Sequence, residues 1–346
     1  MEAVVKVRPE EGGTEIQEVP VPEPGPRDVL IKVKVSSICG TDVHIYEWDP
    51  WAQGRIKLPR IYGHEFAGEV VEVGREVQHV KVGDYVSGEC HIACGHCYLC
   101  RTGNAHICQN VKIFGVDVDG IFAEYFSVPE TNVWHNDPDL KPEYASIQDP
   151  LGNAVHTATA TDLIGKYVAV LGAGPIGVMT VNLAKIFGAA KVFAVGRRNR
   201  YRVDLAKKVG ADLGLLSAED DVLSILAEET KDRGGVDVVL EMTGNPKAVD
   251  MGLKMLRPGG ELVLLGVFPQ PATLDLSKDV VFKYITIYGI NGRLMYKTWY
   301  QMKGLFKSGM LDLDTVITHR FRFSEFEQAM AAMRSGQSGK VVMYME

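Results

Sequence analysis

The sequence predicts an α/β protein in which a doubly wound parallel sheet is inserted into a β-rich region formed by the two ends of the chain. Two changes in the pattern of apolar residues along the 346 residues support this prediction. Short apolar or alternating runs fill residues 1–150, whereas strand and helix patterns alternate over 151–290. The alternation ends near residue 291, so we expect one domain from 1–150 and 291–346 and another from 151–290.

The first region reads as a series of short strands. Its apolar or alternating runs are separated by Pro, Gly and Asp, which favour turns. The runs are AVVKV at 3–7, DVLIKVKV at 28–35, FAGEVVEVG at 66–74, DYVSGE at 84–89 and AEYFSV at 123–128. This region is therefore predicted to be β-rich.

The middle region contains buried-type strands with helical patterns between most of them. The strands are VAVLG at 168–172, KVFAVG at 191–196, LGLL at 213–216, VDVVLEMTG at 236–244, GELVLLG at 260–266 and TIYGI at 286–290. Strands joined by helices form right-handed βαβ units, which build a parallel sheet. The remaining chain predicts a helix, TWYQMKGLFKSG, and a closing strand, KVVMYM.

The composition makes some classes of function unlikely. Hydrophobic residues make up 46% and the formal net charge is −7, so a general nucleic-acid or acidic-membrane surface is not expected. No secretory signal is visible at the start, and the longest apolar run, 167–187, is broken by glycines and a proline. A cytoplasmic location and a small-molecule substrate are the resulting expectations.

Four of the six cysteines lie in one segment, CGHCYLCRTGNAHIC. Cys94, Cys97, Cys100 and Cys108 can close a tetrahedron of thiolates around Zn²⁺ with no open position, which predicts a structural zinc. Free or disulfide-bonded thiols are the alternative, although clustered cysteines in a reducing compartment are more often metal ligands. An iron–sulfur cluster also uses four cysteines, but the spacing differs from common ferredoxin runs.

A glycine-rich turn joins the first strand and helix of the middle region. Gly172, Gly174 and Gly177 form G-x-G-x-x-G between a buried strand and an apolar helix, the context that this pattern requires. Gly172 permits the tight turn, Gly174 lets the backbone approach a pyrophosphate, and Gly177 lets helix and strand pack closely. An ordinary βα turn is the alternative, and we favour a dinucleotide site.

The ribose-binding position lacks the expected acid. An Asp or Glu normally stands there, about 20 residues past the glycines, but the chain reads VGRRNRYR, with Arg197 and Arg198. An arginine can pair bidentately with a 2′-phosphate, which favours NADP over NAD. These arginines could also simply begin a solvated helix, although positive charge is slightly unfavourable there.

A second metal site is suggested by scattered residues. Cys39 stands in ICGTDVHIY, and GHEF supplies His64 and Glu65. A thiolate, an imidazole and a carboxylate can hold zinc and leave a position for water or substrate. Asp149, in QDPLGNAVH, is a candidate for a fourth or alternate carboxylate ligand. By spacing alone the signal is weak, because a lone cysteine and a lone histidine are more often core residues.

The chain resembles the zinc-containing medium-chain alcohol dehydrogenases. GHEFAGEVVEVG, GDYVSGE, the four-cysteine loop and VLGAGPIG occur in that family's order, and the match covers essentially the whole chain. More narrowly, ICGTDVHIYEWDPWAQ, DPLGNAVHTA, TWYQM, ITHRF and RSGQSGKV resemble the L-threonine 3-dehydrogenases. The resemblance implies a GroES-like catalytic domain, a Rossmann domain, two zinc ions per subunit and usually a homotetramer.

The resemblance also implies roles for single residues. Cys39, His64 and Glu65 would hold the catalytic zinc, with Thr41 and His44 as the proton relay. Asp149 matches a family position that affects activity, and His91 one near substrate. The positions that match cofactor contacts are Ile176, Arg202, Leu265, Gly266, Val267, Ile290 and Asn291. Arg197 departs from the acidic residue of NAD-dependent members, so the family favours NAD where the arginines favour NADP.

The implied reaction is oxidation of a secondary alcohol by hydride transfer to the nicotinamide. L-Threonine would give 2-amino-3-oxobutanoate. One alternative is an NADP-dependent polyol or sugar-alcohol dehydrogenase of the same superfamily. Another is a nucleotide-binding protein that kept the fold without catalysis, which loss of Cys39 or His64 would mark; both are present.

Overall fold

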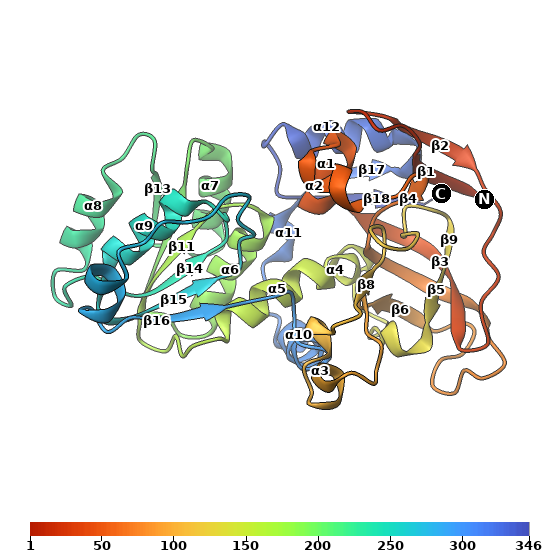
Figure 1. The fold of residues 1–346 in the computed structure, drawn as a ribbon, viewed down its shortest axis with the longest axis horizontal. Helices are drawn as coiled ribbons and strands as arrows, with labels where there is room; N and C mark the ends of the chain where they lie inside the picture. Colours follow the sequence, from red (N-terminus) through yellow and green to blue (C-terminus); the bar gives the residue numbers. More distant parts are fainter. Residues whose placement is uncertain (346) are drawn as a thin grey trace. The chain divides into compact units, whose positions relative to one another are not determined.

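The structure is a computed structural model that describes residues 1–345. The chain forms two compact units (Figure 1). Unit 1 comprises Met1–Pro150 together with the chain from Ile317 onward, and unit 2 comprises Leu151–Val316. None of the helices in the described residues has both the length and the apolar composition that a bilayer crossing requires.

Unit 1 is β-rich, as the sequence predicts. Its strands are β1 (Glu2–Lys6), β2 (Thr14–Glu18), β3 (Asp28–Ser37), β4 (Arg60–Ile61), β5 (Glu65–Val73), β6 (Tyr85–Gly88), β7 (His91–Ile92), β8 (Lys112–Ile113), β9 (Tyr125–Pro129), β10 (Val133–His135), β17 (Ile317–Arg322) and β18 (Lys340–Tyr344). They form sheets in the orders β2-β1-β4, β10-β6-β5-β3-β18-β17 and β7-β8, and β9 also pairs with β3. Strand β3 is therefore the centre of the largest sheet.

Short helices connect these strands. They are α1 (Gly40–Glu47), α2 (Pro50–Arg55), α3 (Tyr98–Arg101), η1 (Ala105–Ile107), η2 (Glu130–Asn132), α4 (Pro142–Ser146), η4 (Phe323–Glu325) and α12 (Phe326–Arg334). Helix α12 packs on β17 and β18, and α1 packs beside both α2 and α12. The C-terminal segment is thereby built into the N-terminal β-rich unit.

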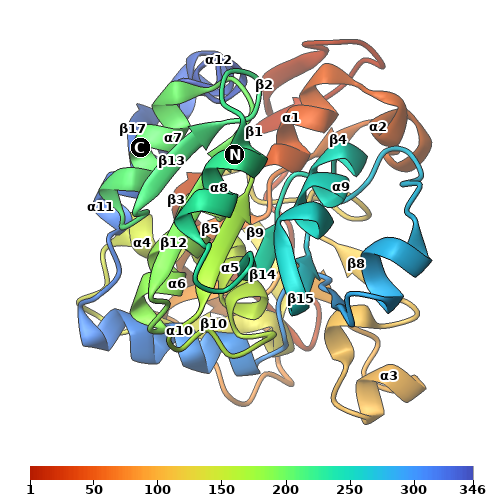
Figure 2. The same cartoon turned by 90° about the vertical axis from the view of Figure 1, so that its left-hand side faces the viewer.

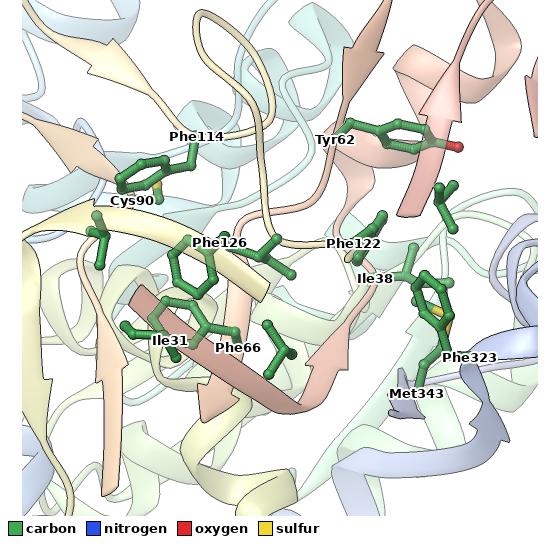
Figure 3. Packing of buried hydrophobic residues seen from close by; sticks show 14 of the residues in the cluster. Ile31, Ile38, Tyr62, Phe66, Cys90, Phe114, Phe122, Phe126, Phe323 and Met343 are labelled. Carbon is green, nitrogen blue, oxygen red and sulfur yellow. The ribbon is translucent and has the colours of Figure 1, made fainter. Parts of the chain in front are cut away.

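An aromatic-rich core stabilises unit 1 (Figure 3). The rings of Phe66 and Phe126 meet edge to face with centroids 4.6 Å apart. Tyr62, Phe122 and Phe326 form a second group of tilted and edge-to-face rings. Burial of each large apolar side chain contributes about 1.5–3 kcal/mol, so this core holds the strands that carry the candidate site.

Unit 2 contains the predicted parallel sheet. Its elements are α5 (Gln148–Ala158), which begins in unit 1, β11 (Tyr167–Leu171), α6 (Pro175–Ile186), β12 (Lys191–Gly196), α7 (Arg200–Lys208), β13 (Leu213–Leu216), α8 (Val222–Glu229), β14 (Val236–Glu241), α9 (Pro246–Met255), β15 (Leu256–Leu264), η3 (Leu276–Val281), β16 (Thr286–Gly289), α10 (Lys297–Ser308) and α11 (Leu313–Val316). The strand order is β13-β12-β11-β14-β15-β16, and every pair is parallel. Figure 2 labels β12, β13, β14 and β15 of this sheet. This strand order is the doubly wound order of dinucleotide-binding domains.

Unit 2 extends beyond residue 291, which is where the change in sequence pattern predicted its end. Helix α10 buries Trp299 and Met302. The Met302 Cε atom lies 3.4 Å from the place that a Cβ would take on Gly152, in α5. Helix α11 packs on α6 and α7. Residues 291–316 thus belong to the compact unit that contains the parallel sheet.

Candidate active site

Two paired strands carry the first set of candidate metal ligands. Strand β3 pairs antiparallel with β5, and Ser37 lies opposite Glu65. The chain then reaches Cys39 at the N-terminus of α1, while His64 immediately precedes β5. A sulfur of Cys39, a ring nitrogen of His64 and a carboxylate oxygen of Glu65 all lie within 4.8 Å of one another.

Gly63 allows His64 to reach this position. Its φ of +90° lies in the left-handed region, and a Cβ there would stand 2.4 Å from Cδ1 of Phe122. Any other L-residue would therefore be strained and would displace a core ring. The glycine that precedes the histidine is a packing requirement of the site.

Asp42 places a negative charge next to two of the three candidate metal ligands, Cys39 and His64. Its Oδ2 accepts a hydrogen bond of 2.8 Å from the Cys39 backbone N–H, and its Oδ1 lies 3.7 Å from His64 Nδ1. Burial raises the pKa of Asp42 to about 6, although His64 and the Cys39 N–H oppose this rise. Burial alone would lower the pKa of His64, but Cys39 and Asp42 outweigh it and raise that pKa well above its usual value.

Glu65 is held through one of its two carboxylate oxygens. The Oε2 atom accepts hydrogen bonds from Ser37 Oγ and from Nζ of Lys340, which also donates to the Ile38 carbonyl at 2.8 Å. Glu65 and Lys340 are both buried. The C-terminal strand β18 therefore supplies the cation that compensates this buried carboxylate.

The three residues fit a zinc ion. Thiolate, imidazole and carboxylate are its usual ligands, and three protein ligands leave an open position. Within residues 1–345, the buried Glu65 Oε1 atom has no hydrogen-bond partner, and a metal ion would supply one. The donor set also concentrates negative charge, which raises the proton affinity of His64 and which a divalent cation would neutralise. Their role as ligands remains a prediction.

The predicted relay residues lie on α1. The Thr41 Oγ1 atom lies 3.9 Å from Cys39 Sγ. His44 follows three residues later, so both side chains lie on the same side of the helix. The Nδ1 atom of His44 lies 2.8 Å from Oδ2 of Asp49, a residue that the sequence alone did not single out.

Asp149 lies apart from this group. It is buried in the first turn of α5, and it is not among the residues that converge within 4.8 Å. Its predicted role as an alternate ligand or catalytic carboxylate therefore stays a prediction.

His91 is held by two buried side chains. Its Nδ1 atom lies 2.8 Å from Glu89 Oε1, and Asn132 Nδ2 donates to the carbonyls of Glu89 and His91 at 2.8 and 2.9 Å. Glu89, Cys90 and His91 also bring metal-ligand atoms together. The Glu89–His91 distance is that of a hydrogen bond, and Cys90 packs in the core with Phe114 (Figure 3). We therefore interpret them as a positioned histidine and a core thiol.

The four loop cysteines form a separate cluster. The Cys97 sulfur lies 3.5 Å from that of Cys100 and 3.8 Å from that of Cys108. Zn–S bonds of about 2.3 Å at tetrahedral angles place sulfur atoms about 3.8 Å apart, so the spacing fits a structural zinc. Backbone N–H groups of His96 and Cys97 lower the pKa of Cys94 to about 5, which favours the thiolate that a metal requires.

The candidate cofactor residues follow one edge of the parallel sheet. The carboxyl ends of five strands lie in register: Leu171 faces Val195 and Glu241, Glu241 faces Leu264, and Leu264 faces Gly289. The carboxyl ends of β11, β12, β14, β15 and β16 thus form one edge. Ligands of doubly wound sheets bind outside this edge.

The structure brings nearly all predicted cofactor positions to this edge. Those directly after a strand are Gly172, Arg197, Arg198, Leu265, Gly266, Val267, Ile290 and Asn291. Ile176 and Arg202 lie in the first turns of α6 and α7, which begin at the same edge. Gly174 is the N-cap of α6, so the backbone N–H groups of that helix point toward it.

Two of the glycines are required by different contacts. Gly172 has a φ of +105°, and a Cβ on Gly177 would stand 1.8 Å from the Gly172 carbonyl oxygen. A Cβ on Gly174 would meet nothing within 4 Å. Gly172 and Gly177 therefore serve the fold, whereas the space beside Gly174 is free for a ligand.

The side chains at the ribose-binding position are basic. Arg197 and Arg198 are exposed directly after β12. Arg200, the next arginine, pairs with Glu219 at 3.1 Å. Burial lowers the pKa of Arg202. Arg197 and Arg198 thus offer cationic groups to an anion at the sheet edge.

Several residues that contact the predicted site residues were not predicted from the sequence. Asp42 had a local signal, because it follows Cys39 at the three-residue spacing of a helix cap. Lys340 had none, since it contacts Glu65 from a strand 275 residues away in sequence. Asp49 and Glu89 are separated by a few residues from the histidines that they contact, but many unpaired acids have such spacings.

Comparisons with known proteins agree with this geometry. Residues 25–138 match the alcohol dehydrogenase GroES-like domain and residues 175–308 the zinc-binding dehydrogenase family. An L-threonine 3-dehydrogenase of Caldanaerobacter subterraneus subsp. tengcongensis is 53% identical, covering 99% of each chain. Galactitol-1-phosphate dehydrogenase of Escherichia coli has a TM-score of 0.91 at 27% identity, covering 99% of this chain and 100% of that one.

A third relative shows a bound cofactor. The structure of a zinc-binding dehydrogenase from Sinorhizobium meliloti 1021 bound to NADP has a TM-score of 0.89 at 30% identity, and covers 99% of this chain and 98% of that chain. The predicted combination of a GroES-like domain and a Rossmann domain is thereby confirmed. A non-catalytic nucleotide-binding role is excluded by the family. The chain belongs to the zinc-binding, NAD(P)-dependent alcohol dehydrogenases.

Proposed function

We propose that the chain oxidises the secondary alcohol of L-threonine to 2-amino-3-oxobutanoate. The observation that carries the reaction type is the convergence of Cys39, His64 and Glu65 within 4.8 Å, with Thr41 beside the cysteine. The substrate is inferred from the relative that is named L-threonine 3-dehydrogenase and is 53% identical. Unit 1 would carry the chemistry and unit 2 the cofactor.

A zinc ion held by Cys39, His64 and Glu65 would act as a Lewis acid toward the alcohol oxygen, and a nicotinamide would accept the hydride. The chain's own residues would move the proton. The Thr41 hydroxyl would accept it from the substrate and donate its own proton to His44. The exposed His44 imidazole can then release a proton to water.

Arg197 and Arg198 support NADP as the preferred cofactor. A 2′-phosphate at the carboxyl edge of β12 would meet two exposed guanidinium groups, whereas the ribose hydroxyls of NAD would find no carboxylate at either position. The four loop cysteines support a second, structural zinc, giving two zinc ions per subunit. Clustered thiols of this kind also favour a reducing, cytoplasmic location.

Initial rates with L-threonine and a panel of polyols, each with NAD and NADP, test the proposal. We expect the highest kcat/KM for L-threonine with NADP. Rates on L-threonine no better than on polyols would reject the substrate, and much greater efficiency with NAD would reject NADP. Cys39→Ala should lose activity and one zinc, whereas Cys90→Ala removes a core thiol outside the donor set and should retain both.

A polyol or sugar-alcohol substrate is the second candidate. It is favoured by the similarity to galactitol-1-phosphate dehydrogenase and by the arginines at the cofactor edge. A polyol lacks the ammonium and carboxylate of threonine, so the same substrate panel separates the two candidates.

We also propose that the protein is a homotetramer. Exposed apolar side chains gather along η3, the edge strand β16 and the segment between them, where Phe282 and Tyr284 are 83% and 86% exposed. Residues 286–289 contain no charge or proline, the features that protect an edge strand from pairing. Light scattering should give the mass of four chains, and Phe282→Asp should give a smaller particle. A monomeric wild-type protein would reject the proposal.

A further inference from the structure

The Asp49 carboxylate lies between α1 and α2 and contacts both. Its Oδ2 atom lies 2.8 Å from Nδ1 of His44, and its Oδ1 accepts a hydrogen bond of 2.9 Å from the Ala52 backbone N–H. The second contact makes Asp49 the N-cap of α2. We infer that Asp49 is a positioning residue for the proton relay, which fixes the tautomer of His44 and stabilises its protonated form. This inference rests on the proposed relay.

The tautomer follows from the chemistry of the contact. An ionised carboxylate only accepts hydrogen bonds, so Nδ1 of His44 must carry the proton that lies between them. In the neutral ring, Nε2 is then the nitrogen with a free lone pair. Without Asp49, either nitrogen could hold the proton, and part of the protein would present a donor where the relay needs an acceptor.

The transfer is a balanced proton movement. The O–H bond of Thr41 breaks and an Nε2–H bond forms on His44, while the Thr41 oxygen receives the proton of the substrate alcohol. His44 becomes an imidazolium next to the negative charge of Asp49, which lowers the free energy of that state. The proton then passes to water, because the His44 side chain is 57% exposed.

The local fold holds Asp49 in place. Trp48, in the left-handed conformation with a φ of 54°, ends α1 and turns the chain back. The Asp49 N–H then donates to the His44 carbonyl at 3.3 Å, and the rings of His44 and Trp51 meet edge to face with centroids 6.2 Å apart. The carboxylate therefore has two defined contacts and a fixed backbone. An exposed ion pair adds little stability, so we expect the contact to affect catalysis more than folding.

Two substitutions of Asp49 distinguish its role as the N-cap of α2 from its role in the proton relay. Asp49→Asn keeps a good N-cap for α2 but removes the charge that fixes and stabilises His44, whereas Asp49→Ala removes both. Asp221 offers a matched control, since it N-caps α8 through the Ser224 N–H and has no histidine partner there. Asp221→Asn should leave both activity and stability unchanged.

The experiment measures the rate of reduced-cofactor formation in a single turnover, with the alcohol that the enzyme oxidises best. His44→Gln serves as the background without a relay. Asp49→Asn should lower the rate about 10-fold in the wild type, a modest fraction of the range for general acid–base groups, with an unchanged melting temperature. In the His44→Gln background it should have no further effect, because the two residues act as a unit.

Three results would overturn the inference. The first is a wild-type rate in Asp49→Asn. The second is an equal fall in the presence and absence of His44. The third is a wild-type rate in His44→Gln, which would also remove the relay from the proposed function. Failure of the threonine assignment alone would change only the alcohol used, so the two failures are distinguishable.

Discussion

The Oδ1 atom of Asp42 lies 3.7 Å from Nδ1 of His64, and both side chains are buried. The other carboxylate oxygen of Asp42 accepts a hydrogen bond from the Cys39 N–H. One acid therefore orients two of the three candidate ligands and adds a negative charge behind the cation that they would hold.

Asp42→Asn should weaken zinc binding at this site. Loss of such a supporting residue typically lowers metal affinity about 10–100-fold, because it leaves the imidazole less basic and less well oriented. Competition with a chromogenic chelator measures the affinity. Asp84→Asn is a suitable control, since it removes an acid 3.0 Å from His135, outside both candidate zinc sites. Unchanged zinc affinity in Asp42→Asn would show that Asp42 does not support the ligands.

Gly177→Ala should lower the stability of the fold, whereas Gly174→Ala should weaken cofactor binding. Gly177→Ala places a Cβ 1.8 Å from the Gly172 carbonyl, so unit 2 should lose about 3 kcal/mol or more of unfolding free energy. Gly174→Ala meets no atom and should fold normally, but its methyl group would stand where a pyrophosphate approaches. We expect a KM for the cofactor at least ~10-fold higher. A normal cofactor KM in Gly174→Ala would contradict the dinucleotide site.

Arg197→Glu should reverse the cofactor preference. Losing a charge-assisted hydrogen bond to the 2′-phosphate costs about 1.5–3 kcal/mol, so kcat/KM with NADP should fall about 10–100-fold. The introduced carboxylate can accept hydrogen bonds from the ribose of NAD, so efficiency with NAD should rise. Arg200→Gln removes a nearby arginine that already pairs with Glu219, and should change neither value. Equal effects of both substitutions would indicate nonspecific electrostatics.

Cys94→Ser should affect stability more than chemistry. A structural zinc contributes folding free energy directly, so the variant should lose one zinc per subunit and melt several degrees lower. Elemental analysis and thermal unfolding measure these effects, and the activity per folded molecule at 25 °C should be largely retained. A stably folded variant without activity would contradict the structural role of the loop.

Asp237→Asn should destabilise unit 2 in a pH-dependent way. Burial alone would raise the pKa of Asp237, but the Tyr167 N–H at 2.7 Å and the guanidinium groups of Arg257 and Arg233 outweigh it and lower the pKa. The contribution is therefore present above the unfolded pKa of about 3.9 and is lost as the pH falls through the lower folded-state pKa. We expect a loss of about 2–3 kcal/mol at pH 7.

Urea unfolding at several pH values tests this expectation. The difference between wild type and Asp237→Asn should be similar at pH 7 and pH 5 and should shrink below about pH 4. Asp250→Asn, which removes an exposed pair with Lys254, should cost less than about 0.5 kcal/mol at every pH. A pH-independent difference would mean that the Asp237 charge is not the stabilising feature.

All six strands of the parallel sheet could be predicted, although β14 ends at Glu241 rather than at 244 and β15 begins at Leu256 rather than at 260. Strands at 191–196 and 213–216 were expected at the bounds that β12 and β13 have. Strands covered on both faces are continuous apolar runs, and the glycine turn fixes where the first one ends. Helix α1 could not be predicted, because GTDVHIYE is rich in residues that favour strands and buries only Asp42 and Ile45.

The candidate site was predictable in its donor atoms and not in its supports. Cysteine, histidine and glutamate are recognisable as metal ligands by their chemistry, and the order of the family's motifs indicates which of them belong to one site. The contact between Lys340 and Glu65 depends on β18 pairing with β3, which no local pattern announces. The Asp49–His44 contact depends on the left-handed Trp48, a conformation that a tryptophan rarely adopts.

Strand β3 has consequences for how the protein is made. It pairs with β5 and β9 early in the sequence, but its third partner, β18, follows the whole parallel-sheet unit in sequence. Lys340, at the start of β18, reaches the Ile38 carbonyl 302 residues back. On the ribosome, the whole parallel-sheet unit is therefore translated before residues 35–37 of β3 gain this partner. A nascent chain keeps the Glu65 carboxylate without its buried ammonium partner until Lys340 has been translated and β18 has paired with β3.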